Sequence, residues 1–188
     1  MRKTFLATLF YLPLCVFLVT GISRAGMHEE TVNLKLAPVP GVKSDASGTA
    51  SFKLSKDGTA VHYKLNLTKI DNATMSHIHT VGMDGKRGAV IVWLYPTTGM
   101  APSLKEGAFI GTLAEGDITS DKLGGPWKGK SAKDLFEGIE YGTLGVAVHT
   151  KQNPGTELWG VSARKAKTGE MERKKGEYEE REHKGGGY

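Results

Sequence analysis

SGTASFKLSKDGTAVHYKLNLT, residues 47–68, is the stretch that decides the fold class. Polar and apolar residues alternate on both sides of a turn, as in strands that bury one face and expose the other. Asp57-Gly58 is a dipeptide typical of tight β-hairpins. The stretch therefore predicts two neighbouring antiparallel strands, residues 47–55 and 59–68.

The same alternation continues along the chain outside this hairpin. Further extended segments are predicted at 31–37, 75–80, 89–95, 107–114, 143–150 and 156–163. Residues 117–123 favour a short helical turn, and Ser131 can cap a helix over 132–140. We therefore expect an all-β fold: an antiparallel, Greek-key-like β-sandwich or barrel of about eight strands with one short helical insertion.

The run Ala89–Tyr95 differs from the other predicted strands because almost every residue in it is apolar. Strands that are covered on both faces show such runs. The pattern predicts a central strand that carries Trp93.

The two ends of the chain have compositions unlike the middle. Residues 1–25 combine Arg2-Lys3, an apolar run and the small-residue pattern Ser23-Arg24-Ala25, which predicts a signal peptide cleaved before Gly26. An uncleaved membrane anchor is the alternative, since the run approaches the length of a span. Residues 164–188 are rich in Lys and Glu and end in glycines, which predicts a disordered tail. The domain is expected over residues 26–163, exported to a secreted or periplasmic location with no membrane span after processing.

Charge and cysteine content exclude several classes of function. The 188 residues carry a formal charge of +5. The excess lies in the two ends, so the predicted domain is neutral and offers no electrostatic footprint for nucleic acid. Cys15, the one cysteine, lies in the predicted signal peptide. The mature chain would therefore hold no disulfide, zinc-thiolate, blue-copper or iron–sulfur site.

Three histidines form the candidate site. His77 and His79 share one face of a strand, because side chains two positions apart point the same way. His149 lies on a later strand, with the small residues Gly145 and Ala147 on its face. If the two strands are neighbours, the three imidazoles converge, with ring nitrogens within about 4–5 Å of one another and ligand bonds of roughly 2.0–2.1 Å to a shared ion.

Three neutral imidazoles without a thiolate suit copper or zinc, and they leave one coordination position open. Met75 shares their face and is a candidate weak axial ligand to copper, or a core residue. Affinity should weaken as the pH falls through about 6.5, since imidazole binds metal in its neutral form. The metal-free alternatives are two partly buried histidines bonded to backbone carbonyls, or a pair of histidines on a solvated face. His62, by contrast, points outward by alternation.

Four blocks in order resemble the CHRD domain, a module named from chordin and found in secreted microbial proteins. The blocks are Ala46–Phe52 with Asp57–Thr59; Ser76–His79 with the glycine loop that follows; Ile118–Leu123 through Gly125-Pro126 and Gly129–Ser131 to Asp134-Leu135; and Val146–Thr150 with Asn153–Gly155 and Glu157–Gly160. The three histidines match the family pattern. Ala89 and Trp159 depart from it, since the family tends to have proline and arginine there.

The resemblance implies an extracellular all-β domain and supplies no reaction. It leaves open an extracellular protein partner of unspecified identity. A looser resemblance to Cu,Zn superoxide dismutase rests on its β-barrel, its His-x-His pair and a further copper-ligating histidine on a late strand. We therefore expect a binding module that holds copper or zinc, rather than an enzyme. A small copper redox enzyme and a metal-free structural or adhesive domain are the alternatives.

Overall fold

The computed structural model describes residues 30–163, and the predicted signal peptide and charged tail lie outside this range. The elements are β1 (Thr31–Pro38), β2 (Ser47–Leu54), β3 (Ala60–Val81), β4 (Arg87–Tyr95), β5 (Lys105–Thr119), two 3-10 turns (Ser120–Lys122 and Gly125–Trp127), α1 (Ala132–Glu140), β6 (Leu144–Thr150) and β7 (Leu158–Val161). None of the helices in this range has the length and apolar content to cross a bilayer.

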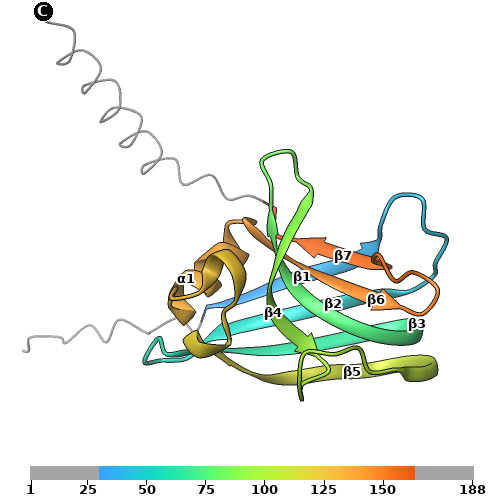
Figure 1. The fold of residues 1–188 in the computed structure, drawn as a ribbon, viewed down its shortest axis with the longest axis horizontal. Coiled ribbons are helices and arrows are strands. Elements are labelled where there is room, and N and C mark those ends of the chain that lie inside the picture. The colour runs from blue at the N-terminus through green and yellow to red at the C-terminus, as the bar shows by residue number, and fades with distance from the viewer. Residues whose placement is uncertain (1–29, 164–188) are drawn as a thin grey trace, which may run out of the picture.

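An antiparallel barrel forms because β3 pairs with a different strand along each half of its length. Its first half pairs with β2 and its second half with β6, and β1 and β7 complete the path between those two strands. Strands β4 and β5 pair with the opposite edge of β3. Figure 1 shows β3 running through the whole assembly, so that both halves of the sheet are built on it.

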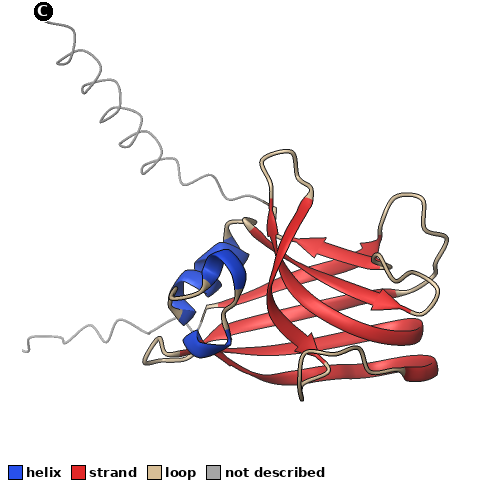
Figure 2. Cartoon of the chain, in the orientation of Figure 1, coloured by secondary structure: helices blue, strands red, loops and turns tan. Residues whose placement is uncertain are grey.

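The predicted all-β class is confirmed. The described residues form seven strands rather than about eight, because the predicted segments 59–68 and 75–80 belong to one continuous strand, β3. The predicted hairpin is present, with Phe52 opposite Tyr63 in the core. The predicted helix is α1, which begins at a Ser131 capping box and gathers with the 3-10 turns at one end of the strands (Figure 2).

The side chains of β3 change face along its length. Leu67 and Ile78 both face the core, although an odd number of positions separates them. The alternation shifts at irregularities in the pairing, two of which lie beside Lys69 and Asn72, residues with left-handed φ values of 55° and 53°. Extra residues of this kind are β-bulges, which bend a strand and re-aim its side chains. As a result, the positions next to Ile78 face the outside of the barrel.

The prediction of a central strand at Ala89–Tyr95 is wrong. β4 lies at an edge of the sheet, since β3 is the one strand with which it pairs in the described range. Its outer edge is covered by the 3-10 region instead, where Gly124 N–H donates to the Ile91 carbonyl at 2.8 Å. This cover and the barrel core explain the apolar run, because Ile91, Val92 and Leu94 are each at most 2% exposed.

Candidate metal centre

The three predicted histidines lie together on the outer face of the β3–β6 pair. His77 and His79 come from β3 and His149 from β6, and Met75 lies opposite His149 in the register. One ring nitrogen from each histidine lies within 4.8 Å of those of the other two. The ring centroids are 5.1 to 6.3 Å apart. The predicted convergence is confirmed, while metal binding stays a prediction.

The cluster is buried, although it lies outside the barrel core. His77, His79 and His149 are each at most 5% exposed. Four of their six ring nitrogens are buried without a hydrogen-bond partner: both nitrogens of His77, and Nε2 of His79 and His149. Buried polar atoms normally have partners, and one left without a partner costs about 1–3 kcal/mol. These nitrogens therefore need an explanation beyond packing.

Backbone carbonyls fix two of the rings. Nδ1 of His79 lies 3.0 Å from the Gly88 carbonyl, and Nδ1 of His149 lies 2.9 Å from the Pro154 carbonyl. A carbonyl oxygen only accepts, so each Nδ1 must carry the hydrogen. In the neutral ring, Nε2 then keeps its lone pair. Metal-binding histidines are oriented by partners of this kind.

All three imidazoles are held in the neutral form. Burial, together with the neighbouring His149, His79 and Arg87, lowers the pKa of His77 to about 3. Burial also lowers the pKa of His79 and His149, against the opposing effect of their bonds to backbone carbonyls. The rings therefore keep the protonation state that metal binding requires at pH values where an exposed histidine would already be charged.

Two tryptophans flank the cluster. The Trp93 ring lies 4.2 Å from that of His77 and the Trp159 ring 6.2 Å from that of His79, measured between centroids and both edge-on. Trp159 fits because Gly145, below it, has no side chain: a Cβ there would come within 2.6 Å of the indole. The sequence predicts that Gly145 leaves room beneath an imidazole. In the structure, Gly145 instead makes room for the Trp159 indole.

A buried carboxylate organises the β6–β7 loop, which supplies the Pro154 carbonyl. Glu157, 6% exposed, accepts hydrogen bonds from the Ser44 and Thr150 hydroxyls at 2.6 Å and from the Asn153 amide at 2.8 Å. Burial raises the pKa of Glu157, but these three bonds outweigh that effect and leave it below its usual value. Sequence reasoning missed this residue, because Ser44 is far from it along the chain.

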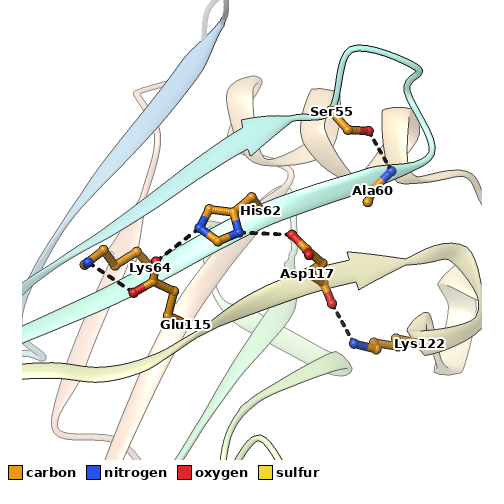
Figure 3. Close-up of polar contacts among 7 residues, drawn as sticks. All are labelled: Ser55, Ala60, His62, Lys64, Glu115, Asp117 and Lys122. Atoms are coloured by element: carbon orange, nitrogen blue, oxygen red, sulfur yellow. Dashed lines mark hydrogen bonds and ion pairs between the residues drawn. The ribbon is translucent and has the colours of Figure 1, made fainter.

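His62 lies on the exposed surface, as predicted, but it is not isolated. Its Nδ1 lies 3.0 Å from Asp117 and its Nε2 3.3 Å from Glu115, while Lys64 pairs with Glu115 at 3.1 Å (Figure 3). With about half of its side chain in solvent, His62 is a suitable control for the buried cluster.

The CHRD domain pattern matches residues 28–161, which include β1 to β7 and all three clustered histidines. The chain belongs to the CHRD domain family. Neither curated proteins nor solved structures give a match. In this CHRD domain, Trp159, one of the two positions that depart from the family pattern, lies against the cluster and not on an open surface.

Proposed function

We propose that this CHRD domain is an extracytoplasmic binding module that holds one copper or zinc ion through His77, His79 and His149. The observation that carries the proposal is the set of buried, unpartnered ring nitrogens that face one another within 4.8 Å. Three imidazole ligands with an open fourth position are a donor set that both metals accept.

A metal-free structural role accounts less well for the cluster. Histidines that serve packing alone would leave those nitrogens unsatisfied in a dry environment, at a cost in free energy. A bound ion satisfies one nitrogen of each ring, and the carbonyl bonds of His79 and His149 already account for their other nitrogens. The proposed extracytoplasmic location rests on the signal-like residues 1–25 and on the extracellular setting of the family.

Titration of the purified chain with Cu²⁺ and Zn²⁺, followed by elemental analysis, tests the proposal. We expect one ion per chain near neutral pH. His79→Ala should abolish stoichiometric binding, whereas His62→Ala should leave it unchanged because His62 belongs to a separate, exposed network. No affinity for Cu⁺, Cu²⁺ or Zn²⁺ in the unsubstituted chain, or equal loss in both variants, would show that the buried histidines are structural.

A further inference from the structure

The donor atoms of the histidine cluster bring no negative charge to a bound ion. Within residues 30–163 the cluster consists of His77, His79 and His149, with no carboxylate or thiolate among its potential ligands. Neutral imidazoles leave the full charge of an ion in place. Because the cluster is at most 5% exposed, water can offset little of that charge.

The energetic cost of such a charge rises steeply with its size. The desolvation penalty of an ion in a medium of low dielectric grows with the square of the charge, so a divalent ion meets about four times the penalty of a monovalent ion of similar radius. Protein sites for divalent ions commonly reduce this penalty with carboxylate or thiolate ligands. This cluster lacks that compensation.

Arg87 adds a positive charge beside the cluster. Its guanidinium donates to the Gly155 carbonyl at 2.9 Å, which fixes its position next to the β6–β7 loop. Arg87 precedes Gly88, whose carbonyl orients His79, and Gly155 follows Pro154, whose carbonyl orients His149, so the guanidinium is held between the two segments that flank the rings. Its positive charge opposes any cation held by these rings, and it opposes a divalent ion twice as strongly as a monovalent one.

We propose that the site binds copper as Cu⁺ in preference to Cu²⁺ and Zn²⁺, and that Arg87 strengthens this preference. The inference rests on the metal function proposed above and names the ion. Copper is the metal suited to imidazole that is also stable as a monovalent ion. The two indoles beside the cluster, Trp93 and Trp159, add apolar walls that favour the lower charge.

Competition experiments on the purified full chain test the preference. Cu⁺ affinity is measured without oxygen, with ascorbate and a Cu⁺-specific chromophoric chelator, and Cu²⁺ and Zn²⁺ affinities are measured against nitrilotriacetate in chloride-free buffer. We expect the chain to bind Cu⁺ at least tenfold more tightly than either divalent ion. A tenfold preference over Cu²⁺ corresponds to a rise of 59 mV in the potential of the bound couple relative to the free ions.

Variants of Arg87 test its part in the preference. Arg87→Gln should reduce the ratio of Cu⁺ to Cu²⁺ affinity by about three- to tenfold, while Arg87→Lys should keep it, because lysine preserves the charge. Lys86→Gln is the matched control, since Lys86 is the preceding cation but is 84% exposed and paired with Asp84. It should leave the ratio unchanged.

Two results would overturn the inference while leaving the metal function intact. One is a divalent affinity equal to that for Cu⁺ in the chloride-free buffer. The other is an affinity ratio that Arg87→Gln does not change. Failure of every ion to bind would instead overturn the proposed function itself.

Discussion

The guanidinium of Arg87 donates a 2.9 Å hydrogen bond to the carbonyl of Gly155, and this contact joins the two segments that orient the histidines. Gly88, which follows Arg87, supplies one orienting carbonyl, and Pro154, which precedes Gly155, supplies the other. The start of β4 and the β6–β7 loop therefore hold each other in place. The ring orientations depend on backbone that is fixed by long-range contacts.

Replacing the buried carboxylate of that loop should weaken metal binding. Glu157→Gln puts an amide where three donors now converge, so at least one of them loses its acceptor. We expect a loss of about 1–3 kcal/mol in the free energy of unfolding. Metal affinity should fall about 10- to 100-fold, the range seen for groups that support ligands.

Chemical denaturation and metal titration measure these two effects. Glu115→Gln is the control, because that carboxylate is exposed and its bonds go to Lys64 and His62. It should change neither quantity by much. Unchanged metal affinity in Glu157→Gln would mean that the loop does not position His149.

The metal-free domain should lose stability as the pH falls from 6.5 to 5. In this window the unfolded chain takes up protons on its histidines at their ordinary pKa near 6.5, whereas the folded chain keeps His77 neutral and holds the pKa of His79 and His149 below the ordinary value. The unfolded state therefore binds more protons, and the free energy of unfolding decreases. The loss should approach 1.4 kcal/mol per pH unit from His77, whose folded pKa is about 3, and His79 and His149 should add to it in the same direction.

Urea unfolding at several pH values within this window measures the slope. His149→Asn should flatten this slope, because it removes one of the buried histidines whose pKa is lowered in the folded chain. The low pKa values also change the expectation for metal binding: affinity should persist below pH 6.5, because the rings of the folded protein remain neutral there. A midpoint for metal release at about 6.5 would contradict the burial of the cluster.

Metal should stabilise the fold, and a chelator should reverse the effect. An ion that binds the native state alone adds about 2.7 kcal/mol to the free energy of unfolding when it is present at 100 times its Kd. Thermal unfolding of the purified chain should show a higher Tm with metal and the original Tm after chelation. His77→Ala should abolish the shift, since both nitrogens of His77 are available to the ion. The same shift in that variant would place the ion elsewhere.

Adding a methyl group at Gly145 should displace Trp159. The new Cβ would lie 2.6 Å from the indole and 2.9 Å from the Gly160 carbonyl, so the ring must move. Overpacking of this kind costs about 1–3 kcal/mol. We expect a lower Tm and a red-shifted tryptophan emission, because the indole would gain contact with water.

Gly155→Ala provides the matched control for Gly145→Ala. A Cβ at Gly155 meets no atom within 4 Å, and the backbone carbonyl that binds Arg87 is unchanged. The control should keep the Tm and emission of the unsubstituted chain. An equal effect in both variants would mean that close packing at Gly145 is not the cause.

Local sequence signals predicted the hairpin, α1 and the pair His77 and His79, because each depends on alternation, turn chemistry or capping within a short window. The position of β4 could not be predicted in this way. Its apolar run indicates that the residues are buried, but not what covers them. Here a 3-10 turn covers the edge that a neighbouring strand would otherwise cover.

The supporting residues of the site were also beyond local patterns. Glu157 meets Ser44 across 113 positions, and Arg87 meets Gly155 across 68. Trp159 is placed by the absence of a side chain at Gly145 on the neighbouring strand. Each of these contacts exists only after the barrel has closed, which is why the cluster could be suggested from sequence but its surroundings could not.

Because the alternation of β3 shifts at its bulges, the number of residues at the bend decides which face of the second half of the strand points into the barrel. Removing a single residue at the bend, for instance Asn72, would restore the opposite parity and turn His77 and His79 inward while Ile78 turned outward. In a related chain, a one-residue difference in this segment would therefore separate a domain with an intact histidine cluster from one without it, even when every histidine is retained.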